Sequence, residues 1–241
     1  MMDLINFILL VLLAVVGMLV LWLALNWLGL YIRQNFVGKA RARELSADFP
    51  DEDFQAVASN DEVMGLIDFP HVYKESRWGG RLEIYNLIAG RDEAIEYSVF
   101  DLRSSGGSES AAYTRSVFVL QMAGADLISF VLGLESFGMA VLWGEDTDID
   151  IENEFVFSKT YHLSGPERER ISLLFDSELV GFIKAHMLFF NAGSLTVNND
   201  SLMYGASQKL DAEGIRESLS VLFKLMALLS DKSKQIVTIT L

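Results

Sequence analysis

Residues 95–122 read IEYSVFDLRSSGGSESAAYTRSVFVLQM, and this stretch decides the fold. From Ile95 to Val99 apolar residues alternate with polar ones, which is the period of a half-buried β-strand. Residues 103–110 are rich in Gly and Ser and predict a flexible hairpin tip. Residues 113–122 are rich in β-branched and aromatic side chains and predict the returning strand. The stretch therefore predicts an antiparallel hairpin.

Similar strand patterns flank this hairpin on both sides. Their alternating apolar residues are Leu82, Ile84 and Leu87, then Ile128, Phe130, Leu132 and Leu134, then Phe155 and Phe157, and finally Tyr161 and Leu163. Residues 195–204 read LTVNNDSLMY and predict a second hairpin around an Asn-Asn-Asp turn. The chain ends IVTITL at 236–241, which predicts a last strand.

Two amphipathic helices are expected after the first strands. One begins at residues 164–167, where Ser-Gly-Pro-Glu has the pattern of a capping box with an early proline. The other begins at Asp211, and Leu210 and Ile215 around that cap have the spacing of a hydrophobic staple. Their apolar stripes are Ile171, Leu174, Phe175, Leu179, Phe182 and Ile183, and Ile215, Leu219, Leu222, Met226 and Leu229. The expected fold is α+β, an antiparallel sheet with two helices packed on one face.

An uncharged run, Leu4 to Ile32, precedes this domain. A bilayer core about 30 Å thick needs roughly 20 mostly apolar residues in a helix, so the run predicts one N-terminal transmembrane helix. The competing interpretation is a cleaved signal peptide. Such peptides begin with basic residues and have an apolar run of 7–15 residues, whereas this chain begins Met-Met-Asp and its run is longer.

Cations flank only the exit end of this predicted helix. The positive-inside rule therefore places the N-terminus outside the cell inner membrane and the following domain in the cytoplasm. Aromatic rings near the same end favour the membrane interface. The residues expected at the interface of the lipid bilayer are Trp22, Trp27, Tyr31, Arg33, Lys39, Arg41 and Arg43.

The chain then divides into three expected parts. Residues 1–32 are the anchor, residues 33–70 a basic juxtamembrane segment and an acidic linker, and residues 71–241 the α+β domain. The formal charge is −14, and all but one of the 33 acidic residues lie beyond residue 43. An acidic domain does not bind the phosphates of nucleic acid. The chain has no cysteine, which fits a reducing compartment and excludes disulfides and thiolate chemistry.

Residues 145–154, EDTDIDIENE, invite comparison with a calcium-binding loop. Asp146, Asp148 and Asp150 match the first three ligand positions of an EF-hand. The match then fails, because Ile151 stands where Gly is needed and Phe157 where Glu is needed. The favoured interpretation is a strand with one solvated acidic face, and the three aspartates are weak metal candidates.

The sequence predicts no catalytic residue and no cofactor. His71, His162 and His186 form no metal-binding or catalytic spacing, and structural or surface roles are expected for them. Nucleophile-elbow, Walker and dinucleotide-binding patterns do not occur. Phe189, Phe190 and Trp143 fit none of the strand or helix patterns. Core packing is the favoured interpretation for these three, and a docking patch for a partner is the alternative.

Several short segments after Tyr85 carry a resemblance: Val99–Asp101, Thr114–Val119, Phe130–Glu135, Asp148–Asp150, Phe157–Tyr161, Leu163–Gly165 and Leu174-Phe175. On these segments the chain resembles a bacterial family of uncharacterised, membrane-anchored proteins. The resemblance covers about 90 residues and departs at Gly133-Leu134, where similar proteins tend to have Arg-Pro. It implies a membrane anchor and a cytoplasmic α+β domain without catalytic residues.

Three functions remain open from the sequence. The leading hypothesis is a non-catalytic, membrane-anchored accessory or scaffolding subunit of a larger complex, with other integral membrane proteins as partners. The second is a membrane-tethered sensor domain that binds a small ligand or peptide. The third is a metal-assisted hydrolase that uses Asp146, Asp148 and Asp150.

Overall fold

The computed structural model describes residues 15–25, 38–57, 81–105, 113–135 and 148–240. The chain forms two compact units, Met1–Ala47 and Asp48–Leu241. In the first unit, residues 15–25 are helical and a second helix, α2 (Gly38–Asp48), runs to the unit's end. Within the described ranges, no helix combines the length and apolarity that crossing a bilayer requires. The predicted span 4–32 lies within the described residues only at 15–25, whose apolar side chains are exposed.

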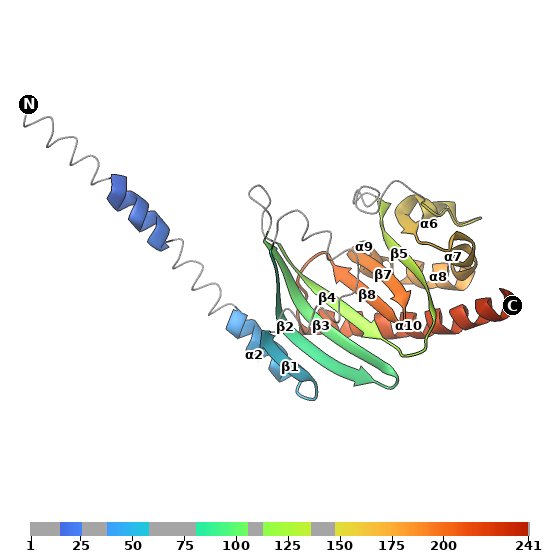
Figure 1. The fold of residues 1–241 in the computed structure, drawn as a ribbon, viewed down its shortest axis with the longest axis horizontal. Coiled ribbons are helices and arrows are strands. Elements are labelled where there is room, and N and C mark those ends of the chain that lie inside the picture. The colour runs from blue at the N-terminus through green and yellow to red at the C-terminus, as the bar shows by residue number, and fades with distance from the viewer. Residues whose placement is uncertain (1–14, 26–37, 58–80, 106–112, 136–147, 241) are drawn as a thin grey trace, which may run out of the picture. The chain divides into compact units, whose positions relative to one another are not determined.

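The second unit is built on one eight-stranded antiparallel sheet (Figure 1). The strands follow one another in the order β1-β2-β3-β4-β8-β7-β5-β6. They are β1 (Asp53–Val57), β2 (Arg81–Asp92), β3 (Ile95–Ser105), β4 (Tyr113–Gln121), β5 (Leu127–Leu134), β6 (Tyr161–Ser164), β7 (Gly193–Asn199) and β8 (Ser201–Ala206). The α+β class and the antiparallel sheet are therefore as predicted. Strand β1 falls within the stretch predicted to be a linker.

Both predicted hairpins form. Strands β3 and β4 pair from Glu96 opposite Gln121 to Ser104 opposite Tyr113, and β3 runs three residues into the stretch predicted as the tip. Strands β7 and β8 turn at Asn199, whose φ of 51° is left-handed. Asparagine tolerates this conformation better than most residues, which explains the Asn-Asn-Asp sequence of the turn.

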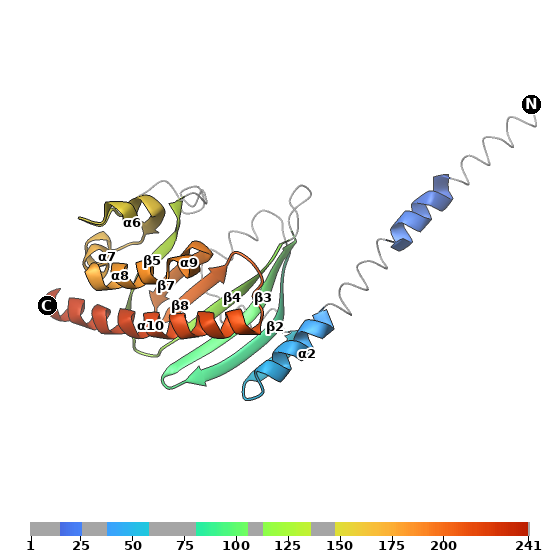
Figure 2. The same ribbon diagram turned by 180° about the vertical axis from the view of Figure 1, so that it is seen from behind.

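Helix α10 (Ala212–Thr240) lies along one face of the sheet, where Figure 2 shows it in front of the strands. Its start is as predicted, because the Asp211 Oδ1 atom accepts the backbone N–H of Gly214 at 2.8 Å. Its whole predicted stripe is buried, and it contacts β4 and β5. The Tyr97 and Phe223 rings meet edge to face at 5.5 Å, which joins β3 to the same helix.

The other predicted helix is divided into α7 (Arg168–Leu174) and α8 (Ser177–Ala185), and a short helix that was not predicted, α9 (Met187–Asn191), follows them. The predicted capping box is wrong, because Ser164 belongs to β6 and no side chain caps α7. The break falls at Phe175 and Asp176. Asp176 caps α8, and its Oδ1 atom accepts the backbone N–H groups of Glu178 and Leu179 at 3.1 and 3.0 Å. The Asp176 side chain thus caps the start of α8 directly after the end of α7.

Two predicted strands are helical in the structure. Residues 155–160 form α6 (Phe155–Thr160), in which Phe157 is buried and Phe155 exposed. Residues 236–240 continue α10. Tertiary contacts explain the second difference: Ser233 accepts the Ile128 N–H at 3.2 Å, and Ile236 is buried. These contacts outweigh the β-propensity of Ile-Val-Thr-Ile-Thr.

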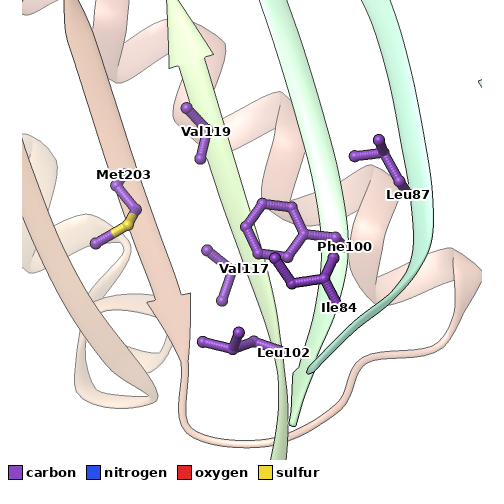
Figure 3. Packing of buried hydrophobic residues seen from close by; sticks show 7 residues of the cluster. All are labelled: Ile84, Leu87, Phe100, Leu102, Val117, Val119 and Met203. Carbon is purple, nitrogen blue, oxygen red and sulfur yellow. The ribbon is translucent and has the colours of Figure 1, made fainter. Parts of the chain in front are cut away.

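The face of the sheet opposite α10 carries a second apolar cluster (Figure 3). Phe100 pairs with Val117 across β3 and β4, and Met203 pairs with Val119 across β8 and β4, so these side chains share one face. All seven members are 7% exposed or less. They are Ile84, Leu87, Phe100, Leu102, Val117, Val119 and Met203. The central strands are therefore buried on both faces.

Candidate functional site

Three ionisable side chains meet at the end of the sheet formed by β5 and β6. The two strands pair antiparallel with Gly133 opposite His162, so His162 faces a residue without a side chain. Glu135 follows β5 directly and lies two residues beyond Gly133, on the same face of the sheet. The register of β5 and β6 thereby brings Glu135 towards His162.

Asp148 reaches the same place from the other side of β6. The Ile149 N–H donates to the Leu163 carbonyl at 2.7 Å, and the Leu163 N–H donates to Asp148 Oδ1 at 3.0 Å. The Arg168 guanidinium donates to the backbone carbonyl of Asp148 at 3.2 Å. The Asp148 backbone and carboxylate are therefore both held in place beside His162.

The three side chains form what we call the histidine–carboxylate cluster. Its His162 Nδ1 atom lies 3.7 Å from Glu135 Oε2 and 3.6 Å from Asp148 Oδ1. The His162 side chain is 8% exposed, against 52% for Glu135 and 36% for Asp148. A buried imidazole thus faces two carboxylates that solvent reaches. Such a set can hold a cation, or a protonated histidine can pair with the carboxylates.

The aspartates predicted as weak metal candidates separate in the structure. Asp148 belongs to the histidine–carboxylate cluster, whereas Asp150 is exposed and does not join it. Asp146 lies outside the described residues. The alternation expected of this acidic run is present at Ile149 and Ile151, which are buried, although residues 148–151 form no strand.

Sequence reasoning missed Glu135 and His162 as members of a site. They are separated from each other by 27 positions, and neither has a metal-ligand spacing with Asp148. Their proximity depends on the pairing of β5 with β6, which no short motif encodes. The acidic run was the one local signal, and it pointed to the correct residue only at Asp148.

The remaining unassigned residues of the sequence have structural positions. His186 ends α8, where its Nδ1 atom lies 2.9 Å from the Phe182 carbonyl oxygen. Phe190 is buried as expected, and Phe189 stacks on Tyr204 with ring centroids 4.1 Å apart. His71 and Trp143 lie outside the described residues.

The residues predicted at the membrane interface are only partly described. Trp22 is 63% exposed on the first helix. Arg41 and Arg43 lie on α2, where Arg41 is buried and Arg43 exposed. Lys39 lies in the first turn of α2. The other three, Trp27, Tyr31 and Arg33, lie outside the described residues.

A second polar group, which we call the aspartate network, lies between the central strands. Asp101 is buried and accepts the Asn86 amide at 2.9 Å and the Ser116 hydroxyl at 3.1 Å. The Ser116 oxygen in turn accepts the backbone N–H of Leu210 at 3.0 Å. Asn86 sits in the β-bulge of β2 with a φ of 55°. The network fixes the bulge, two strands and the segment that leads into α10.

A shallow hollow of about 190 Å³ lies over β2, β3 and β4, beside Gly90, Tyr97 and Gln121. Burial raises the pKa of Tyr97 to about 12, and a hydrogen bond to Glu52 adds to this effect, so the phenol stays protonated at neutral pH. Small-molecule sites usually enclose 300–1,000 Å³. The hollow therefore gives little support to the sensor hypothesis.

Four large apolar side chains, which we call the α6–α9 surface, are exposed on neighbouring segments. They are Phe155 and Val156 on α6 and Met187 and Leu188 on α9, and each is between 52% and 81% exposed. An ion pair between Glu154 and Lys184 joins the start of α6 to the last turn of α8, which leads into α9. Exposed apolar groups that lie side by side are typical of protein contact sites, whereas single ones are common on any surface.

No protein-family model matches the chain, and no curated protein matches it either. The chain is similar to the crystal structure of the mycobacterial trehalose monomycolate transport factor A, TtfA. The sequences are 11% identical, the match covers 79% of this chain and 93% of that chain, and the TM-score is 0.44. A likeness at this level carries no functional inference.

Proposed function

We propose that the protein is a membrane-anchored accessory subunit of a larger membrane protein complex. The uncharged run from Leu4 to Ile32 is the observation that carries this proposal. Within the run, the large apolar side chains of residues 15–25 are 50–64% exposed. A helix that presents apolar side chains in every direction is suited to lipid or to a helix of a partner.

The anchor holds the α+β domain at the cytoplasmic side of the inner membrane. Arg33, Lys39, Arg41 and Arg43 follow the run, and the only charged residue before it is Asp3. This asymmetry supports an external N-terminus. The acidic charge of the domain opposes its adsorption to anionic lipid and leaves its surfaces open to a protein partner.

The α6–α9 surface is the part of the domain that best suits a protein partner. Val156 and Leu188 are 70% and 81% exposed, and burying a side chain of this size stabilises a complex by about 1.5–3 kcal/mol. The partner that fits is another integral membrane subunit, because the anchor restricts the domain to encounters at the membrane.

The test is an affinity purification of tagged, full-length protein from its native membranes in mild detergent, followed by mass spectrometry. We expect a reproducible set of integral membrane subunits. A double variant, Val156→Asp with Leu188→Asp, should lose these partners and keep its own fold, because both side chains are exposed. Gln208→Asp, which adds a negative charge at another exposed position, should retain them.

Two results would overturn the proposal. One is recovery of the wild-type protein alone, at its own mass, from native membranes. The other is recovery of the protein in the fraction without membranes, since the anchor would then not be inserted.

A further inference from the structure

We propose that the histidine–carboxylate cluster binds one divalent transition-metal ion, of the kind that Zn²⁺ and Mn²⁺ represent. His162, Glu135 and Asp148 each offer one ligand atom, and these atoms all lie within 4.8 Å of one another. The site is independent of the accessory function and of the membrane anchor.

The separations between the ligand atoms fit a shared ion. Two protein ligands that bind one ion at roughly 2.1 Å lie about 3–3.5 Å apart in tetrahedral or octahedral geometry. The His162 Nδ1 atom lies 3.6 and 3.7 Å from the two carboxylate oxygens. A movement of a few tenths of an ångström would bring the His162 nitrogen and either carboxylate to this spacing, and the two carboxylate oxygens already lie within 4.8 Å of each other.

The same separations are too long for hydrogen bonds. An N–H donor and its oxygen acceptor usually lie 2.7–3.2 Å apart. The His162 side chain is 8% exposed, and its Nδ1 atom lies 3.6 and 3.7 Å from the two carboxylates, beyond that range. The imidazole is thus held among protein groups while its Nδ1 atom faces two carboxylates without bonding them, which leaves that nitrogen available to an ion between them.

The charge and the ligand types select the kind of ion. Two carboxylates and a neutral imidazole carry a total charge of −2, which a divalent cation neutralises. Mg²⁺ and Ca²⁺ prefer sites made only of oxygen ligands. A nitrogen ligand favours Zn²⁺ or a neighbouring first-row metal. Three protein ligands also leave a coordination position for water, which solvent reaches beside Glu135.

The protein holds part of this site in place without the ion. The Leu163 N–H orients the Asp148 carboxylate, and the Arg168 guanidinium binds the Asp148 backbone carbonyl instead of that carboxylate. Gly133 opposite His162 leaves space beside the imidazole. Such outer contacts orient metal ligands and raise affinity.

The test is calorimetric titration of full-length protein in detergent, freed of metal with a chelator, with ZnCl₂ and separately with MnCl₂. We expect one ion per chain for at least one of the two metals. Glu135→Gln and Asp148→Asn should each weaken the binding of that ion about tenfold or more. X-ray absorption of the Zn²⁺-loaded protein should show one histidine nitrogen among the ligands.

The control variant is Asp150→Asn, which removes the same charge at an exposed position two residues from Asp148. It should leave affinity and stoichiometry unchanged. The proposal is overturned if the wild-type protein binds neither metal with a 1:1 stoichiometry. It is also overturned if Asp150→Asn weakens binding as much as Glu135→Gln does, because the acidic surface as a whole would then hold the ions. Because Glu135 is exposed, the Glu135→Gln variant should keep its fold. A loss of binding in this variant can therefore be attributed to the site.

Discussion

The two polar groups of the sheet differ in the distances between their atoms and in their access to solvent. In the aspartate network, Asp101 accepts hydrogen bonds from Asn86 and Ser116 at 2.9 and 3.1 Å. In the histidine–carboxylate cluster, the corresponding distances are 3.6 and 3.7 Å. The first group lies between central strands and is closed, whereas the second lies at the edge strand β6 and is open to solvent on its carboxylate side.

This difference separates a structural role from a binding role. A buried carboxylate whose oxygens all have donors stabilises the fold, and it loses that effect when one donor is removed. A buried imidazole without a bond at hydrogen-bond distance adds less to the fold and retains the capacity to bind a ligand. We therefore expect the aspartate network to respond to mutation, and the histidine–carboxylate cluster to respond to metal.

The largest expected effect is that of Asp101→Ala. This change leaves the Asn86 amide and the Ser116 hydroxyl without their acceptor inside the sheet, and it should lower the free energy of unfolding by about 3 kcal/mol. The measurement is urea unfolding of the full-length protein in detergent, followed by circular dichroism. Asp150→Ala is the matched control and should change stability by less than about 0.5 kcal/mol. Equal losses in the two variants would show that the network is not structural.

The next effect concerns Asp176, a further carboxylate whose two oxygen atoms both accept hydrogen bonds. Its Oδ2 atom accepts Lys232 Nζ at 2.5 Å, while its Oδ1 atom caps α8. Asp176→Ala should lower the free energy of unfolding by about 2 kcal/mol, because it removes a helix cap and a charged hydrogen bond. Asp231→Ala, at the exposed neighbour of Lys232, should have little effect.

The pH dependence of this variant tests the same contact. Burial alone would raise the pKa of Asp176, but the hydrogen bonds from Lys232 and from the backbone of Leu179 and Glu178 outweigh it and lower this pKa below its ordinary 3.8. A lowered folded-state pKa contributes stability above pH 3.8, and this contribution is lost as the pH falls through the folded value. The stability difference between wild type and Asp176→Ala should therefore shrink below about pH 3.8. A difference that is constant down to pH 2 would contradict this account.

A smaller effect is expected from metal. At a free Zn²⁺ concentration ten times the dissociation constant, the wild-type protein should gain about 1.4 kcal/mol, which corresponds to a rise of about 3–6 °C in melting temperature. Glu135→Gln, which binds the ion about tenfold or more weakly, should gain at most about 0.4 kcal/mol at the same Zn²⁺ concentration. A destabilised Asp101→Ala protein should show the full rise from its lower starting point. If Zn²⁺ raised the melting temperature of Glu135→Gln but not that of Asp101→Ala, the aspartate network and not the histidine–carboxylate cluster would be the metal site.

The two hairpins and the start of α10 show how much of the fold the sequence predicts. Alternation around a turn specifies strands locally, so residues 95–122 and 195–204 form hairpins as expected. Helix α10 begins as its Asp211 cap predicts. The predicted end of this helix was wrong. Ile236 and its neighbours favour a strand locally, but contacts at Ser233 and Lys232 hold the segment as a helix.

The histidine–carboxylate cluster shows what the sequence does not predict. Asp148 stood out in the acidic run, but the partners suggested by its spacing were Asp146 and Asp150. Its observed partners come from the end of β5 and from β6, and the register of those strands decides which residues meet. Register depends on the packing of the whole sheet, so no local pattern identifies Glu135 or His162.

The smallest expected effect is that of Glu135→Gln without metal. The Glu135 side chain is 52% exposed and lies 3.7 Å from the imidazole, which is too far for a hydrogen bond, so its charge adds little to the fold. We expect the free energy of unfolding at pH 8 to change by less than about 0.5 kcal/mol in the presence of a chelator. Urea unfolding, with and without chelator, measures this change. A loss above about 1 kcal/mol under chelator would mean that Glu135 stabilises the folded protein, and the cluster would then resemble the aspartate network in its role. A small loss of unfolding free energy, together with a weakened stabilisation by Zn²⁺, would show that Glu135 serves metal binding and not the stability of the fold.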